Sequence, residues 1–179
     1  MAEVVAAILF LCAKNPEAMQ RLQSEITEFL GECSSEFHLA DIDLVVKEAL
    51  RLYPAVPLFI REVIPGQSPT LGGYTIPEKT QIFISSWSFH RNPQHWQNPN
   101  DFMPERFTNV PPPCHYFPFG AGPRQCIGMA FTLVCTKVIL VNILSQYSVE
   151  LEPSTTFDTQ YFSGTIMPRE GVKVKLSKK

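Results

Sequence analysis

The placement of proline sets the first limit on how this 179-residue chain can fold. Most of its 16 prolines fall between positions 54 and 123. Proline lacks a backbone N–H donor and disfavours helical backbone at the preceding residue, so this middle region is expected to be extended and rich in turns. Long helices are therefore expected only on either side of it.

Three helices are expected before the proline-rich region, over residues 2–12, 17–29 and 41–53. Asn15 is the expected N-cap of the second helix, with Pro16 at its first position. The polar stretch Gly31 to Glu36 is expected to form a loop, and Pro54 to end the third helix.

Beyond the third helix the pattern indicates small sheets and one more helix. A β-hairpin arm is expected over 71–80, opened by Gly72-Gly73 and turned at Pro77-Glu78-Lys79, followed by a strand over 81–85. Residues 128–145 are apolar all round, which predicts a buried helix. Short strands are expected at 149–151, 157–167 and 172–176. The fold class is thus mixed, mostly α with small β-sheets.

Charge and cysteine usage exclude several classes of function. The formal net charge is −2 with 18% charged residues, so no nucleic-acid partner is expected. The five cysteines are an odd number without Cys-x-x-Cys spacing, which argues against a disulfide framework or a zinc site and favours reducing, cytosol-facing surroundings. The apolar run Val4 to Ala13 is too short to span a bilayer, so no membrane anchor is expected within these residues.

The stretch from Pro118 to Gly128 is the strongest candidate for chemistry, because it delivers one cysteine, Cys126, to the expected start of a helix. Gly120 and Gly122 permit positive φ and close backbone approach to a flat ligand. Unpaired N–H groups and the positive end of the helix dipole would stabilise a negative sulfur there.

Two neighbours of this cysteine complete the pattern. Arg124 supplies a cation for an anionic group on the edge of a ligand. Phe119 offers an apolar lid that limits solvent access to the sulfur. Such a set suits a soft thiolate that holds a haem iron. The alternative to a haem ligand is a buried structural cysteine after a glycine-rich turn.

The spacing Phe-x-x-Gly-x-Arg-x-Cys-x-Gly resembles the haem-binding loop of the cytochrome P450 family. Its fixed positions are met by Phe119, Gly122, Arg124, Cys126 and Gly128. The resemblance implies that residues 1–179 form a partial P450 domain, the C-terminal haem-binding part of that fold. Its parts would be the end of the distal helix, a Glu-x-x-Arg helix, the meander, the cysteine loop, the proximal helix and C-terminal strands. The implied cofactor is haem b, bound through the Cys126 thiolate.

Two further segments fit the same resemblance. Glu48 and Arg51 are three residues apart on one helix face, and Pro104 to Phe107 resembles the family's meander motif, which implies a buried cluster of Glu48, Arg51 and Arg106. This cluster is expected to be structural and to hold the meander and the cysteine loop in register.

The resemblance also implies a ligand pocket. Arg61 falls where the family places a propionate-binding arginine, with an exposed strand-edge arginine as the alternative. Val56, Leu58 and Phe59 are the candidate residues of the substrate pocket, and the segment Tyr161 to Gly164 is the candidate turn that closes it.

The implied reaction is mono-oxygenation of a small apolar substrate. One oxygen atom of O2 is inserted and the other leaves as water, with electrons from an NADPH-dependent reductase or a ferredoxin. The implied location is the cytosolic face of the endoplasmic reticulum membrane, through an N-terminal anchor that these residues do not contain. The family's oxygen-activating acid and threonine are expected before Met1. Two alternatives therefore stay open: a truncated non-catalytic fragment, and a haem-thiolate isomerase or lyase.

Two other groups of residues contain side chains that bind metals in proteins. Cys114 beside His115 is a rival ligand pair, but the rigid Pro111-Pro112-Pro113 link is expected to keep it from a third ligand. His90, next to a loop, is expected to cap or pack and not to bind a metal.

Overall fold

The structure is a computed structural model that describes residues 1–31 and 39–179. The expected loop at Gly31 to Glu36 lies almost wholly outside the described residues. The described helices are α1 (Ala2–Lys14), α2 (Pro16–Gly31), α3 (Ala40–Leu52), α4 (Ser86–Phe89) and α5 (Met129–Gln146), with 3-10 turns η1 (Pro104–Thr108) and η2 (Gly122–Arg124). The described strands are β1 (Leu58–Glu62), β2 (Thr70–Leu71), β3 (Tyr74–Thr75), β4 (Gln81–Ser85), β5 (Tyr147–Leu151), β6 (Thr159–Phe162), β7 (Thr165–Pro168) and β8 (Val174–Lys178). The predicted fold class, mostly helical with small sheets, is confirmed.

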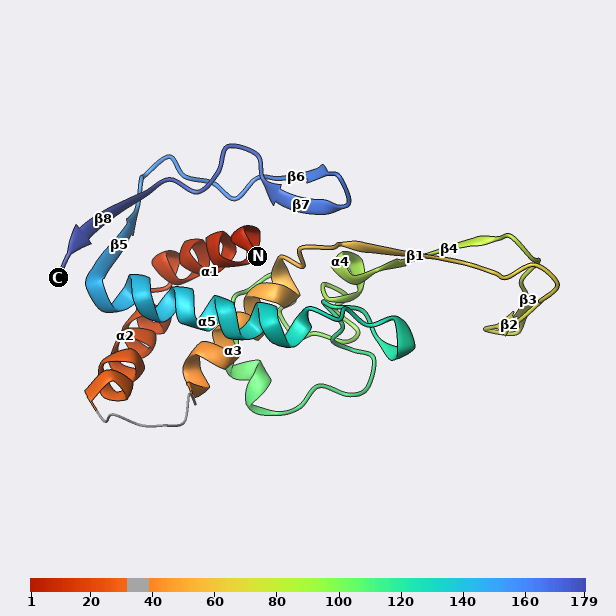
Figure 1. Cartoon of the computed structure of the whole chain (residues 1–179), viewed down its shortest axis with the longest axis horizontal. Coiled ribbons are helices and arrows are strands. Elements are labelled where there is room, and N and C mark those ends of the chain that lie inside the picture. Colours follow the sequence, from red (N-terminus) through yellow and green to blue (C-terminus); the bar gives the residue numbers. More distant parts are fainter. Residues whose placement is uncertain (32–38) are drawn as a thin grey trace.

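Helices α1, α2, α3 and α5 pack together as the body of the molecule (Figure 1). Fully buried side chains from all four, among them Ile8, Leu22, Leu50 and Leu140, form one hydrophobic core. The predicted cap of α2 is confirmed, because the side chain of Asn15 accepts a hydrogen bond from the backbone N–H of Ala18 at 3.2 Å.

The proline-rich middle region forms a long arm. Antiparallel strands β1 and β4 run away from the helices to a tip made by β2 and β3 (Figure 1). Gly72 and Gly73, both at positive φ, make the turn between β2 and β3; they do not open the hairpin as expected. The reason is that two adjacent positive φ values suit a tight two-residue turn. The second expected turn, at 77–79, returns the chain to β4.

The C-terminal strands form two small antiparallel pairs over the helices, β5 with β8 and β6 with β7. Ser163 and Gly164, at φ of 48° and 90°, turn the chain between β6 and β7, as the sequence predicts. The backbone N–H of Ile166 in β7 donates to the carbonyl of Ala55 at 2.9 Å, which ties this pair to the start of the arm.

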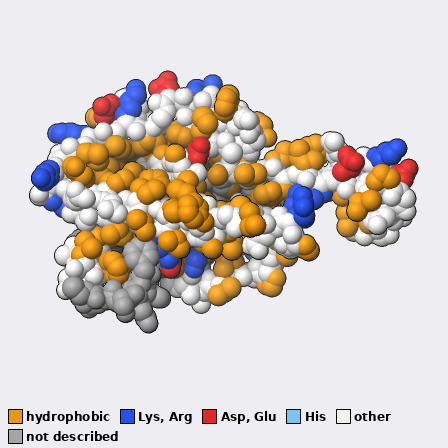
Figure 2. Space-filling model, viewed as in Figure 1, with side chains coloured by type: hydrophobic (Ala, Val, Ile, Leu, Met, Phe, Trp, Pro, Cys, Tyr) orange, Lys and Arg blue, Asp and Glu red, His pale blue; other side chains and the backbone are white. Residues whose placement is uncertain are grey.

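One expectation about the helices is wrong. Helix α5 is not buried all round, because within the described structure it packs on one side only: Leu140 and Leu144 are buried, whereas Phe131 and Val134 are more than half exposed. Figure 2 shows hydrophobic side chains gathered over the face where α5 lies. By length and composition alone, α5 is also apolar enough to cross a membrane.

A buried cluster of charges joins α3 to the segment before the cysteine loop. Glu48 and Arg51 are both fully buried, and their side chains share two hydrogen bonds of 2.7 and 2.8 Å. Arg106 donates to Glu48 at 3.1 Å, so the predicted three-residue cluster is confirmed. Arg51 also donates to the backbone carbonyls of His90 and Pro99, each at 2.7 Å.

Removal of the carboxylate in the Glu48→Ala variant leaves the Arg51 guanidinium buried without its anion. We expect the free energy of unfolding to fall by about 3–5 kcal/mol, measured by urea denaturation. The matched control is Asp158→Ala, which breaks the exposed Arg169–Asp158 pair and should cost less than about 0.5 kcal/mol. Equal losses in the two variants would contradict a structural role for the cluster.

Candidate haem-thiolate site

The cysteine loop is shaped by its backbone. Gly120 and Gly122 have φ of 75° and 71°, as the sequence predicts, a conformation that disfavours side chains. The N–H of Gly120 donates to the carbonyl of Phe117, and the N–H of Cys126 donates back to the carbonyl of Phe119 at 2.9 Å. The two turns therefore fold the loop on itself and bring Cys126 beside Phe119.

Cys126 lies just before α5, and its residue is exposed. Helix α5 begins at Met129 with Gly128 as its N-cap, one residue later than the predicted start at position 128. A Cβ atom placed on Gly128 would lie 3.9 Å from Cys126 Sγ, so the sulfur sits over the N-cap. A negative sulfur at this position is favoured by the N-terminal end of the helix dipole.

An open cavity of about 220 Å³ lies between the loop and the base of the arm. Its lining includes Phe59 and Arg61 from β1 together with Gly120 and Ala121 from the loop. Arg61 is half-buried, and its Nη1 donates to the carbonyl of Ile60 at 2.9 Å. The structure thus brings Arg61 to the loop although 60 positions separate it from Ala121 (121 − 61 = 60).

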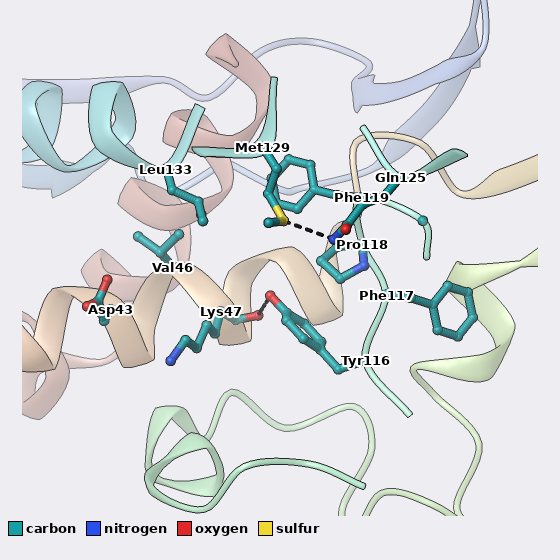
Figure 3. A pocket seen from close by; sticks show the side chains of 11 residues that line it. Asp43, Val46, Lys47, Tyr116, Phe117, Pro118, Phe119, Gln125, Met129 and Leu133 are labelled. Atoms are coloured by element: carbon teal, nitrogen blue, oxygen red, sulfur yellow. Dashed lines mark hydrogen bonds between the residues drawn. The ribbon is translucent and has the colours of Figure 1, made fainter. Parts of the chain in front are cut away.

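A second cavity, of about 190 Å³, lies on the side of the loop that faces α3 and α5 (Figure 3). It is lined by Val46 and Lys47 from α3, Met129 and Leu133 from α5, and the ring of Phe119 among other loop residues. Figure 3 shows Phe119 beside Met129, whose sulfur accepts a hydrogen bond from Gln125 Nε2 at 3.3 Å. The loop is therefore a thin wall between two cavities.

The other predicted residues are placed as follows. Arg124 lies on η2 with its residue exposed. Leu58 and Tyr161 line a third, mainly apolar cavity of about 350 Å³ between β1, β4 and the β6–β7 pair, together with Trp87 and Ile166. Val56 instead supplies a backbone carbonyl that accepts from Ser86 Oγ at 2.9 Å.

His90 has a role that sequence reasoning did not assign. It is fully buried and packs, as expected, with its ring stacked on Tyr116 at a centroid distance of 5.5 Å. Its Nε2 accepts the backbone N–H of Phe117 at 3.0 Å, while its own carbonyl accepts from Arg51. Burial lowers the pKa of His90 to about 4, with the nearby positive charge of Arg51 acting in the same direction. His90 thus links the charge cluster to the cysteine loop in its neutral form.

Comparisons with known proteins agree with this geometry. The family model described as cytochrome P450 matches residues 1–176. The thromboxane-A synthase of Mus musculus is 35% identical over 94% of this chain and 33% of its own length. Cytochrome P450 97B2, chloroplastic, of Glycine max is 34% identical over 99% of this chain and 38% of its own length. Cytochrome P450 4V2 of Mus musculus is 33% identical over 96% and 34%, respectively.

The structure thus places a thiol beside a helix start, on a loop that two glycines at positive φ turn twice. The chain belongs to the cytochrome P450 family. It spans about a third of the length of the curated relatives that it matches. Haem bound through a cysteine thiolate is the cofactor that this family implies.

The buried His90 predicts a pH dependence of stability. The unfolded chain takes up a proton at this imidazole below pH 6.5, but the folded chain does so only below about 4. This contribution to stability is complete above pH 6.5 and is lost as the pH falls towards 4. Between pH 7.5 and 5, unfolding free energy should fall by about 2 kcal/mol more in the wild type than in His90→Leu. Parallel losses in the two proteins would contradict a neutral, buried His90.

Proposed function

We propose that this chain is the haem-binding part of a haem-thiolate monooxygenase. The observation that carries the proposal is the exposed Cys126 at the start of α5, on a loop whose two turns use glycine at positive φ. The available groups fit the cofactor: a thiol donor, backbone without side chains at Gly120 and Gly122, and the guanidinium of Arg61 at the same cavity as the loop.

Each residue has a distinct task in this proposal. The Cys126 thiolate binds the iron, and the α5 N-terminus stabilises its charge. Gly128 lies beside the sulfur, where a Cβ atom would make only an ordinary contact at 3.9 Å. Arg61 and Arg124 bind the carboxylates at the cofactor's edge. Phe119 excludes water from the α3 and α5 side of the loop.

Bound haem supplies the chemistry that this chain's side chains lack, namely the reduction of O2 and the transfer of one oxygen atom to the substrate. The protein's part is to orient an apolar substrate. We expect a small apolar substrate to bind in the cavity lined by Leu58, Trp87 and Ile166, because the walls of this cavity are mainly hydrocarbon and aromatic surface.

The electron donor is proposed to be an NADPH-dependent reductase or a ferredoxin, and the location the cytosolic face of the endoplasmic reticulum membrane. The family resemblance supports both. One relative, from Glycine max, is described as chloroplastic. The subdivision of residues 1–179 into distal helix end, meander, cysteine loop and proximal helix belongs to the same proposal.

A second candidate function is a haem-thiolate isomerase or lyase. It is favoured by the 35% identity to a relative named thromboxane-A synthase. The two functions differ in whether the product gains an oxygen atom from O2, which labelling with ¹⁸O2 during reductase-supported turnover distinguishes. The third alternative, a chain that holds haem too weakly for catalysis, is tested by the next experiment.

Haem reconstitution of the purified chain tests thiolate ligation. We expect the reduced, carbon monoxide-bound form to show the strongly red-shifted Soret band of a thiolate ligand, and Cys126→Ala to lose it. Cys135→Ala is the matched control, since Cys135 lies nine residues along on α5 (135 − 126 = 9) and should leave the band intact. Haem bound without that band would sink the proposed ligand, whereas no bound haem would favour the non-catalytic alternative.

The Arg61→Ala variant tests the proposed edge contact. Loss of one charge-assisted hydrogen bond should raise the dissociation constant for haem by about tenfold, measured by absorbance titration. Arg169→Ala is the control, because Arg169 lies in an exposed pair with Asp158. An unchanged affinity would remove Arg61 from the site and leave the role of Cys126 standing.

A further inference from the structure

Two imidazoles meet beside the segment that leads into the cysteine loop. His95 Nδ1 and His115 Nε2 lie 3.1 Å apart, although 20 positions separate them in the sequence. His95 belongs to the segment between α4 and η1, and His115 directly precedes the aromatic stretch that begins with Tyr116. The residue His95 is exposed and His115 is half-buried, so a solvent ion can reach them.

The second nitrogen of His115 fixes which form of the ring faces His95. His115 Nδ1 lies 3.2 Å from the carbonyl oxygen of Pro113. With the Nδ1–H donated to this carbonyl, Nε2 presents its lone pair to His95. Histidines that bind metals commonly donate their other ring N–H to a backbone carbonyl in this way, which orients the ring and makes the ligand nitrogen more basic.

Phe89 holds both rings in place. The His95 ring stacks on Phe89 at a centroid distance of 4.7 Å and an interplanar angle of 20°. The His115 ring approaches the edge of the same phenyl group at 6.0 Å. Their backbones are fixed as well, because His95 N–H donates to the carbonyl of Asn92 and His115 N–H to that of Pro112, both at 3.0 Å. The pair is therefore preorganised.

The ring geometry suits a shared ion better than a straight hydrogen bond. The two centroids are only 4.6 Å apart, with the rings nearly perpendicular at 80°. A straight N–H···N bond with the observed nitrogen separation of 3.1 Å would separate the centroids by about 5.3 Å, because each nitrogen lies about 1.1 Å from its ring centre. Two nitrogens bound to one ion at about 2.0–2.1 Å lie about 2.9–3.3 Å apart for angles between 90° and tetrahedral.

We propose that His95 and His115 bind a divalent transition metal ion of the Zn²⁺ or Cu²⁺ type, with water at the remaining positions. Imidazole nitrogen is a preferred ligand for these ions. Within the described residues no group of three or more His, Cys, Asp and Glu side chains forms a metal site, so two imidazoles are the protein ligands identified here. This site is separate from Cys126 and does not depend on the proposed function.

The ion would link two segments that are distant in the sequence, namely the one that carries His95 and the one that runs from His115 into the cysteine loop. One carries His90, which already bonds Phe117, and the other runs through His115 into Phe117 and the loop. Metal binding would add a second link between the same two segments. This link would restrict the motion of the segment that leads into the cysteine loop. The thermal midpoint of unfolding should therefore rise on addition of Zn²⁺.

A Zn²⁺ titration of the full, ¹⁵N-labelled chain at pH 7.5, followed through the imidazole nitrogens by NMR, tests the site. The readout is specific for each histidine, so zinc held by cysteine thiols elsewhere does not confuse it. We expect the signals of His95 Nδ1 and His115 Nε2 to shift together, while those of the buried His90 stay in place. The rise in thermal midpoint should follow the same binding curve.

Single substitutions test whether Zn²⁺ binding depends on the two histidines or on a neighbouring side chain. His95→Gln and His115→Gln should each weaken Zn²⁺ binding at least tenfold, whereas Cys114→Ser, next to His115, should leave it within twofold. Unchanged His90 signals and circular dichroism verify that each variant is folded. Imidazole signals that do not move at 1 mM Zn²⁺, or only one histidine that responds, would overturn the proposal and leave an ordinary hydrogen bond between two neutral rings.

Discussion

The buried pair of Glu48 and Arg51 is the interaction on which the rest of the structure depends. Both residues have 0% of their surface exposed, so the pair can exist only if each polar atom finds a partner. Arg51 meets this need by donating to the carbonyls of His90, Pro99 and Asp101, which lie in stretches outside the strands and α-helices. A proline-rich segment that cannot form its own regular hydrogen bonds is thus held by a side chain of α3.

The cysteine loop takes its position from this cluster through a short series of hydrogen bonds. Arg51 fixes the backbone of His90, and the ring of His90 accepts the N–H of Phe117. Within the loop, Phe117 accepts from Gly120, and Phe119 accepts from Cys126. The thiol is therefore connected to the helical core through backbone groups, although its own residue is exposed. Such an arrangement leaves the sulfur accessible while the loop that carries it stays in register.

The features that could be predicted from the sequence are those that depend on interactions between residues close together in the chain. The Asn15 cap, the positive φ of Gly120 and Gly122 and the Glu48–Arg51 spacing all depend on residues a few positions apart, and the structure contains them. The exposed side of α5 was missed because composition shows that a helix is apolar but not which side has neighbours. The partners of His90 and His95 were missed for a related reason: they lie 27 and 20 positions away in segments without periodic structure.

The thinness of the loop explains why its shape must come from the backbone. Gly120 and Phe117 line the cavities on both sides of it, so a single layer of chain separates the Arg61 side from the α3 and α5 side. At Gly120 a Cβ atom would come to 3.7 Å from Phe59, but that is an ordinary contact. The φ of 75° is the stronger constraint, because it strains any other residue whatever the space. Glycine is therefore required there by conformation more than by room.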